Sequence, residues 1–224
     1  MARSSAKPWL LFLVMTQVVS AIIAIGTDIF IFKIGAATVG SIILLTAYFS
    51  QLMKVIDVWV IILAFVCSII GDYFLSHMNG NNSMFIMGIS LYLTAHVGYL
   101  IFSLLNGTIR WKVTILITMV FLIFYYLTLY PNILDKTLAF TVLFYLIVSC
   151  VSLGAAVGIK AIPNIKIPYC IGIVLILFSD TIISFKEFMG FDSLNILILP
   201  TYYLAQICIT IALYNKSKDY VKAI

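Results

Sequence analysis

The sequence has few charged residues for its length. Asp, Glu, Lys and Arg together make up 9% of the 224 residues, whereas a soluble domain carries roughly 25%. Hydrophobic residues account for 64% of the chain, and the mean hydropathy is +1.19. There are too few polar side chains to cover a globule in water, so a soluble domain is excluded. The composition predicts an all-α protein that crosses a membrane several times.

Several motifs of hydrolases, redox sites and nucleic-acid binders are also missing. The four cysteines each stand alone in an apolar run, without a Cys-x-x-Cys pair, and we interpret them as small buried hydrophobic residues. There is no Gly-x-Ser-x-Gly motif, and two histidines are too few for a three-histidine zinc site. The net charge of +5 is spread through short loops, so no nucleic-acid partner is indicated. We therefore predict no metal and no cofactor.

Eight apolar segments follow one another, separated by short loops with turn-forming residues such as Asn79-Gly80. The first segment, Trp9 to Ile25, resembles a signal peptide in outline, but no small-residue cleavage site follows it. It is long enough to cross a bilayer core of about 30 Å, so we expect an uncleaved helix. No linker interrupts the series, which predicts one membrane domain over residues 1–224. The expected helices cover residues 9–26, 33–50, 56–76, 83–105, 111–130, 138–158, 168–188 and 194–214.

The distribution of basic residues predicts the orientation of this eight-helix bundle. If the N-terminus is cytoplasmic, most Lys and Arg residues lie on the cytoplasmic side, as the positive-inside rule requires. The C-terminus is then cytoplasmic as well, and in a bacterium the protein would lie in the inner (plasma) membrane. The residues expected on the cytoplasmic side are Arg3, Lys7, Lys54, Arg110, Lys112, Lys160, Lys166, Lys216, Lys218 and Lys222. Those on the opposite side are Lys33, Lys136 and Lys186.

Two aspartates lie beyond the first turn of the expected membrane helices, next to or within long apolar runs. Asp72 follows the apolar run from Val58 to Ile70, and Asp180 lies in an equally apolar segment with no loop near it. A charged side chain at the middle of a membrane helix costs about 2.5–3.5 kcal/mol on insertion scales, so it usually faces a cavity or a partner. Both helices are predicted to run outward, which places the two acids in the same half of the membrane. We therefore predict that they belong to one site.

Other polar side chains form stripes on the helices around the two acids, because residues three or four apart share a helix face. Three alternatives stay open at this point. Asp72 could be solvated at its helix end, His96 could be a core residue, and Asp72, Asp180 and one histidine could form a mixed metal site. The candidate substrate-binding residues are Tyr92, His96, Tyr99, Ser179, Tyr202, Tyr203 and Gln206.

Two neighbouring carboxyl groups in a medium of low dielectric constant cannot both ionise easily. One then keeps its proton near neutral pH while the other stays charged, which supplies a general acid and a general base together. Glycosidases use such a pair to protonate a leaving group and to stabilise an oxocarbenium ion or activate water. The pair predicts hydrolysis through an electron-poor carbon, with Asp72 and Asp180 as the catalytic residues.

Several short motifs have an order and spacing that point to one family. They are Gly71-Asp72 with Leu75 three residues on, Gly88, His96 and Tyr99, Ser179-Asp180 with Phe188, and Tyr202-Tyr203-Leu204-Ala205-Gln206. In these motifs the chain resembles the YhhN/TMEM86 family of eight-helix membrane proteins, over about the second to the eighth helix. The characterised members of that family are lysoplasmalogenases. Lys33 is followed by Ile34 where the family often has proline, which weakens any role for Lys33.

The resemblance implies hydrolysis of the vinyl-ether bond of a lysoplasmalogen. The products would be a fatty aldehyde and a glycerophospho-choline or glycerophospho-ethanolamine. One aspartate would protonate the vinyl ether at carbon, and the other would stabilise the cation and take a proton from water. His96 and Tyr99 would position the water or the polar head group. The lysophospholipid would enter from the bilayer among other membrane lipids, and a homodimer stays open.

Two further classes of function stay open. A transporter or channel could use the same acids to relay protons or bind a cation, and it would be recognised by an internal repeat. The two acid-bearing helices share little beyond an aspartate near aromatic and serine residues. A non-catalytic lipid-binding protein would use the polar stripes for helix packing alone. Aldehyde release that depends on the two aspartates would distinguish the enzyme from both.

Overall fold

The computed structural model describes residues 8–27, 29–49 and 55–222. Within these ranges the chain is helical, and its β-type pairing is limited to an isolated bridge between Gly107 and Ile159. The predicted all-α class is therefore confirmed for the part that the structure describes. Outside the described residues lie Arg3, Lys7 and Lys54 of the predicted charge pattern, the side chain of Lys222, and the predicted helix end at residue 50.

The apolar segments form helices because helical backbone satisfies its own hydrogen bonds where water is absent. The ends of two helices are set by side-chain caps. The Oδ1 atoms of Asn81 and Asp135 each accept the first free backbone N–H groups of the helix that follows. The helices are α1 (Pro8–Thr27), α2 (Phe30–Lys33), α3 (Gly35–Ala47), α4 (Ile56–Ser76), α5 (Asn82–Leu105), α6 (Trp111–Phe124), α7 (Lys136–Val157), α8 (Pro163–Met189) and α9 (Ile198–Lys222).

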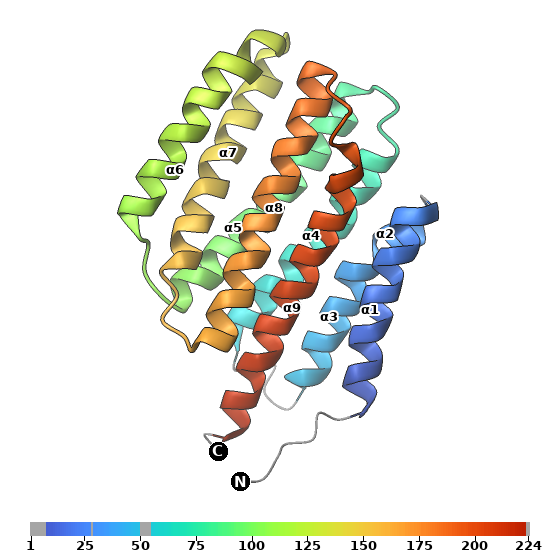
Figure 1. Cartoon of the computed structure of the whole chain (residues 1–224), viewed down its shortest axis with the longest axis vertical. Coiled ribbons are helices and arrows are strands. Elements are labelled where there is room, and N and C mark those ends of the chain that lie inside the picture. Colours follow the sequence, from blue (N-terminus) through green and yellow to red (C-terminus); the bar gives the residue numbers. More distant parts are fainter. Residues whose placement is uncertain (1–7, 28, 50–54, 223–224) are drawn as a thin grey trace.

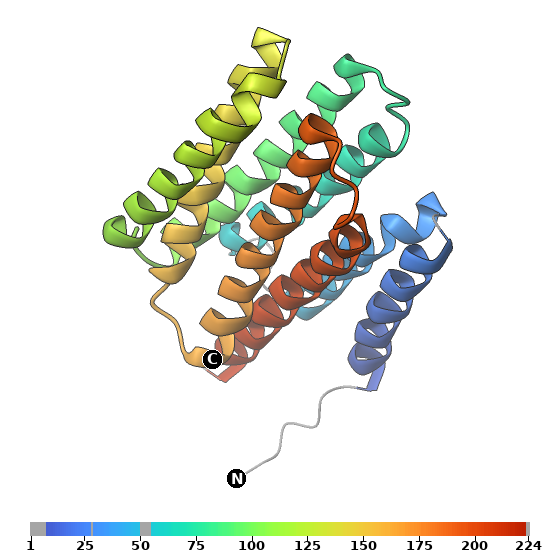
Figure 2. The same cartoon turned by 45° about the horizontal axis from the view of Figure 1, so that its top comes forward.

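The long helices run up and down through one elongated bundle (Figure 1). Helix α4 packs along α5, α8 packs along α9, and α5 and α7 join these two pairs. Helices α1 and α3 lie against α9, and α6 packs on α7 at the opposite edge, as the turned view shows (Figure 2). The start of α1 and the end of α9 lie at one end of the bundle, whereas α2 and the α4–α5 loop lie at the other.

Six described helical stretches are long and apolar enough to cross a membrane, so the chain is an integral membrane protein. Two further apolar helices, Phe12–Thr27 and Gly35–Ala47, are shorter. The 13 residues of α3 span roughly 20 Å at 1.5 Å per residue, less than a typical hydrocarbon core. That these two helices also cross the bilayer stays a prediction. The six stretches are Ile56–Ser76, Asn82–Leu105, Trp111–Asn132, Lys136–Val157, Pro163–Met189 and Asn195–Lys218.

Most predicted helix boundaries lie close to the observed ones, with three clear differences. The last predicted helix, 194–214, is observed over Ile198–Lys222, so it continues well past its predicted end. The predicted helix 33–50 corresponds to α3, which begins at Gly35, whereas Lys33 belongs to the short helix α2 before it. The predicted helix 168–188 begins earlier, at Pro163, which leaves Pro168 inside α8. Proline lacks an N–H group, so Pro168 cannot donate to the carbonyl of Asn164 four residues before it. Asn215 Nδ2 on α9 donates to that carbonyl instead, over 2.9 Å, and the helix continues through the proline.

A buried polar cluster joins three helices at the end of the bundle where α9 terminates. Lys216 Nζ on α9 donates to Asp57 Oδ2 on α4 and to Asn106 Oδ1 at the end of α5. Asn106 Nδ2 also donates to Asp57 Oδ2, over 3.1 Å, and the ammonium lies 5.1 Å from the ring centre of Phe102. Because the charges and donors satisfy one another, we interpret the cluster as a structural contact between the helices.

Candidate active site

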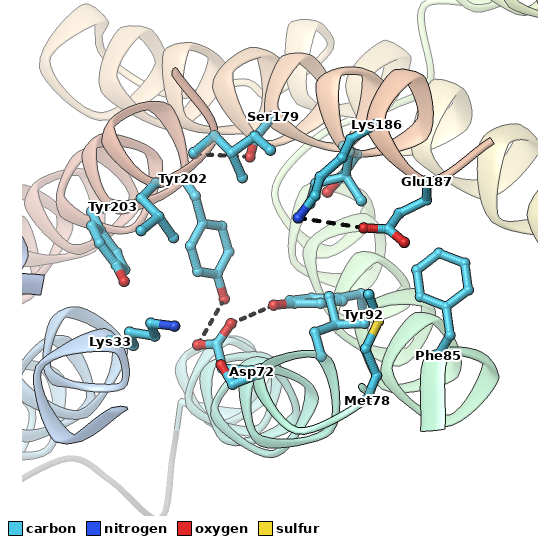
Figure 3. Close-up of a pocket in the computed structure, with 16 residues that line it drawn as sticks. Lys33, Asp72, Met78, Phe85, Tyr92, Ser179, Lys186, Glu187, Tyr202 and Tyr203 are labelled. Atoms are coloured by element: carbon cyan, nitrogen blue, oxygen red, sulfur yellow. Dashed lines mark hydrogen bonds and ion pairs between the residues drawn. The ribbon is translucent and has the colours of Figure 1, made fainter. Parts of the chain in front are cut away.

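A cavity of about 170 Å³ lies at the end of the bundle where α2, α4, α5, α8 and α9 meet (Figure 3). Both predicted catalytic residues, Asp72 and Asp180, contribute to its wall. Helices α4 and α8 run in the same direction, so carboxylates in their C-terminal halves lie toward the same end of the bundle. The other polar residues of the wall are Lys33, Ser76, Tyr92, Ser179, Lys186, Glu187, Tyr202 and Tyr203. Its apolar residues include Leu75, Phe85, Ile183 and Leu199.

Asp72 is held between two tyrosines from other helices. Tyr92 Oη on α5 donates to its Oδ1, and Tyr202 Oη on α9 donates to its Oδ2 over 3.4 Å (Figure 3). The residue is 8% exposed, so it does not extend from the helix end into solvent. The alternative in which Asp72 is solvated at its helix end is therefore wrong. Its two carboxylate oxygens each have a protein donor, as a buried carboxylate requires.

A glycine on α5 lets α4 and α5 approach closely beside Asp72. A Cβ atom on Gly88 would lie 2.6 Å from the side chain of Leu75 on α4, which is closer than carbon atoms can pack. Gly71 precedes the aspartate on α4, and a Cβ atom there would make ordinary contacts, including one of 3.5 Å with the carbonyl oxygen of Gly88. The missing side chain at Gly88 therefore lets the two backbones come together. This contact places Tyr92, four residues after Gly88 on α5, within hydrogen-bond distance of Asp72.

Asp180 receives its hydrogen bonds from a different pair of residues. Tyr145 Oη on α7 donates to its Oδ2 over 2.5 Å, and His96 Nε2 on α5 lies 3.2 Å from the same oxygen. Both partners use Oδ2, so the described residues supply no hydrogen bond to Oδ1. The side chain is 16% exposed. Asp180 therefore has one oxygen fixed by the protein and one available to a molecule in the cavity.

His96 lies behind Asp180 and does not line the cavity. It is 1% exposed, and its Nδ1 has no hydrogen-bond partner among the described residues. Because a carboxylate oxygen accepts, we assign the ring proton to Nε2, from the hydrogen-bond network. The imidazole packs edge-to-face on Tyr99 and Tyr145, with ring centres 5.9 and 5.1 Å away. This enclosure orients the donor toward Asp180.

The structure brings most of the predicted binding residues to the cavity but not all of them. Tyr92, Ser179, Tyr202 and Tyr203 line it together with the two aspartates. Tyr99 is 1% exposed and packs behind His96. Gln206 is fully buried, and both polar atoms of its side chain lack a hydrogen-bond partner within the described ranges. His96, Tyr99 and Gln206 therefore do not line the cavity.

Several residues of the site were not among the predicted ones, and Tyr145, Lys33 and Lys186 are three of them. Tyr145 stands alone in the predicted helix 138–158, and its sole sequence signal is Ser149 four residues later on the same face. Lys33 and Lys186 belong to the few basic residues predicted on the outer side. The positive-inside rule disfavours basic residues there. Their unusual position was the feature of the sequence that could have indicated a role in the site. In Figure 3 the Lys33 side chain points toward Asp72, and Lys186 Nζ lies 3.6 Å from Glu187 Oε1.

The arrangement can hold and move protons beside the cavity. Asp72 has two phenol donors, Asp180 has one phenol and one imidazole donor, and both carboxylates border the cavity. Preorganised donors of this kind stabilise charge that develops at a carboxylate during a reaction. In the described ranges, no three His, Cys, Asp or Glu side chains are grouped so that they could hold a metal. The residues present thus favour acid–base chemistry between two carboxyl groups.

Comparison with known proteins identifies the family. No curated protein and no solved structure matches the chain. Residues 30–213 match the model of the YhhN family. The match includes both aspartates, the tyrosines that bind them and the helices that line the cavity. Because it extends over far more than half of the sequence, the chain belongs to the YhhN family.

Proposed function

We propose that the protein is a membrane-embedded hydrolase that cleaves the vinyl-ether bond of lysoplasmalogens. The products are a fatty aldehyde and a glycerophospho-choline or glycerophospho-ethanolamine. The observation that carries the proposal is the cavity with two aspartates from different helices, each held by tyrosine hydroxyls. Membership of the YhhN family is consistent with this activity.

A vinyl ether reacts with acid at carbon, and two carboxyl groups can supply the required steps. Asp72 in its protonated form donates its proton to the β-carbon of the C=C bond, whose π electrons form the new C–H bond. The α-carbon and the ether oxygen then share the positive charge of an oxocarbenium ion. Asp180, ionised and with Oδ1 available in the cavity, stabilises this cation and takes a proton as water adds to the α-carbon.

The hemiacetal formed by water addition then breaks its C–O bond to the glycerol. Asp180, which now carries the proton from water, donates it to the glycerol oxygen as the C–O bond breaks, and Asp72 takes the proton of the hemiacetal hydroxyl, which becomes the aldehyde carbonyl. The net reaction consumes one water and returns Asp72 and Asp180 to their starting states through proton exchange. His96 and Tyr145 hold Asp180 Oδ2 throughout, so the charge on that carboxylate is stabilised by two donors.

The same proposal gives the protein an orientation in the membrane. We place all eight apolar helices across the bilayer with both chain termini in the cytoplasm. Among the described residues, Arg110, Lys160 and Lys216 then lie at the cytoplasmic end of the bundle, and Lys33 and Lys186 lie at the cavity end. The cavity opens toward the outer face, and in a bacterium the membrane is the inner membrane. The lysophospholipid reaches the cavity from the bilayer.

Aldehyde release by the purified protein tests this function. We expect Asp72→Asn and Asp180→Asn each to lower turnover of a lysoplasmalogen by roughly 100-fold or more, because general acid–base groups contribute about 10²–10⁴-fold. Asparagine keeps the side-chain volume but cannot exchange a proton with substrate. The measurement is aldehyde formed per minute in detergent or lipid nanodiscs.

The matched control is Asp192→Asn, because Asp192 is an exposed acid outside the cavity that bonds Asn195. This variant should keep full turnover. Wild-type turnover in either cavity variant, with the fold intact, would contradict the aspartate mechanism. Solute or proton uptake into proteoliposomes that depends on the two aspartates, without lipid cleavage, would favour a transporter instead.

A further inference from the structure

Two smaller cavities adjoin the main cavity at Asp180. One, of about 60 Å³, lies between α4, α5, α7 and α8, and the other, of about 50 Å³, lies between α6, α7 and α8. They share Val142, Tyr145, Asp180 and Ser184 in their walls. We name the two together the apolar recess, bounded by these four residues, by Phe85 on one side and by Phe124 on the other. Asp180 lines the main cavity and both parts of the recess.

The recess offers hydrocarbon surface and almost no polar partner. Most of its wall consists of Leu, Ile, Val and Phe side chains. The hydroxyls in it are already engaged. Ser184 Oγ donates to the carbonyl of Thr181 over 2.7 Å, Thr181 Oγ1 donates to the carbonyl of Leu177 over 2.7 Å, and Tyr145 Oη donates to Asp180. A ligand with hydrogen-bonding groups would lose its water there without compensation, whereas a hydrocarbon would not.

The polarity of the wall changes at Asp180. On one side, the main cavity carries Lys33, Lys186 and Glu187, which suit a polar or charged group. On the other side, the recess carries apolar side chains such as Val142. A molecule that fills both spaces must be amphiphilic, with its polar and apolar parts joined beside Asp180.

The size and place of the recess favour one chain over two. Its parts, of about 60 and 50 Å³, are much smaller than the main cavity of about 170 Å³. One part reaches α6, which packs on α7 at the edge of the bundle and exposes much of its surface. After α6 the chain makes a π-helical turn, Tyr125–Leu129, and Leu129 from this turn lines the recess. Such turns are frequent at functional sites.

We propose that the apolar recess binds the single hydrocarbon chain of a lysolipid, with the head group in the main cavity and the bond between them beside Asp180. The proposal rests on the proposed function for the reaction at that bond, but binding of the chain does not depend on turnover. Val142 lies between the two parts of the recess and determines how much chain fits. The recess thereby selects single-chain lipids over two-chain lipids.

Photolabelling with a non-cleavable lipid tests this site. The probe is a hexadecyl-ether lysophosphocholine that lacks the vinyl double bond and carries a diazirine in the chain, added to the protein in lipid nanodiscs. We expect labelled peptides from α6, α7 and α8 around the recess. A two-chain ether phosphocholine with the same diazirine should label the exposed faces of the helices instead.

Two substitutions of the same kind give a matched comparison. Val142→Phe fills the recess, whereas Val174→Phe adds the same ring on α8, where Val174 is 48% exposed and lines none of the three cavities. Val142→Phe should weaken recess labelling by about tenfold, because two excluded methylene groups account for a tenfold loss of affinity. Labelling by a probe with an octyl chain should be retained, and Val174→Phe should label as the wild type does.

Val142→Ala tests the recess with a smaller side chain, so the test does not require the fold to tolerate the larger ring of Val142→Phe. It enlarges the recess, so a probe with a methyl-branched chain should label it more strongly than it labels the wild type. Equal labelling of the wild type, Val142→Phe and Val142→Ala would overturn the proposal, as would labelling spread over exposed positions such as Phe140. If Val142→Phe releases aldehyde and is labelled in the recess as strongly as the wild type, the recess proposal is refuted and the hydrolase proposal is not. Recess labelling without aldehyde release supports the recess and refutes the hydrolase.

Discussion

At the scale of single residues, the site consists of carboxylates held by phenol hydroxyls. Tyr92 and Tyr202 bind Asp72, and Tyr145 binds Asp180 together with His96. A buried ionised carboxylate without such partners would cost several kcal/mol, so the tyrosines lower the free-energy cost of placing charged acids there. They also leave Oδ1 of Asp180 available in the cavity, which is the feature that a reaction needs.

Tyr145→Phe tests the contribution of one hydroxyl. The ring and its packing on His96 stay, but the hydrogen bond to Asp180 is lost. A hydrogen bond to a charged group contributes about 1.5–3 kcal/mol, so turnover of the lysoplasmalogen should fall by roughly 10- to 100-fold. Tyr126→Phe is the control, since Tyr126 is 55% exposed. Unchanged turnover in Tyr145→Phe would reduce Tyr145 to a packing residue.

How far single residues can be predicted depends on whether their signal is local. Asp72 and Asp180 were found because an acid in an apolar run has a known cost. Tyr145 was missed because a tyrosine among apolar residues is ordinary, and its partner Asp180 is 35 positions away. Asp57 was missed for the same reason, since Lys216 lies 159 positions away. Partners at such separations in the sequence are brought together by helix packing. The hydrophobic periodicity of a single helix does not predict which other helix it packs against.

At the scale of the helices, close contact between α4 and α5 positions the site. Gly88 faces Leu75, and Gly98 faces Ala64 and the backbone of Val60 on α4. Small residues at such contacts let membrane helices approach until their backbones touch. The contact fixes the rotation of α5, so that Tyr92 and His96 face the aspartates and not the lipid.

Gly98→Ala should separate these two helices. A Cβ atom there would lie 2.9 Å from Ala64 Cβ and 3.1 Å from the Val60 carbonyl oxygen, and neither can move without its backbone. Overpacking of this kind costs about 1–3 kcal/mol, so the midpoint of thermal unfolding in one fixed detergent should fall.

Gly26→Ala is the matched control for that measurement. A Cβ atom on Gly26 meets nothing within 4 Å, and alanine is favoured over glycine in a helix by about 1 kcal/mol. Its unfolding midpoint should therefore equal or exceed that of the wild type. A Gly98→Ala protein as stable as Gly26→Ala would show that the α4–α5 contact is looser than its geometry indicates.

Helix positions were predictable where the signal lies in the helix itself. Residues 56–76 were predicted with both ends correct, because an apolar run of this length has one plausible structure. Pro168 misled the prediction of the next to last helix, because proline usually marks a first turn. Whether a helix continues through proline depends on a substitute donor, and here Asn215 from α9 supplies it. The π-helical turn after α6 likewise has no signal in the hydrophobic pattern.

At the scale of the whole molecule, the two ends of the bundle differ in chemistry. At the end where α9 terminates, Lys216, Asp57 and Asn106 satisfy one another around a closed contact. At the other end, Asp72 and Asp180 border a cavity that continues into the apolar recess. The proposed reaction therefore takes place in one half of the membrane, and the orientation of the bundle decides which aqueous side receives the water-soluble product.

Cysteine accessibility tests that orientation. Ser193 is exposed at the cavity end and Lys160 is exposed at the opposite end, and the four natural cysteines lie within helices, buried or half-buried. With those four replaced by alanine, a membrane-impermeant maleimide should label Ser193→Cys in intact cells and Lys160→Cys after permeabilisation alone. The positive-inside rule gives this expectation, because more Lys and Arg residues lie at the Lys160 end than at the cavity end. Labelling of Lys160→Cys in intact cells, with Ser193→Cys protected, would place the cavity and its product on the cytoplasmic side.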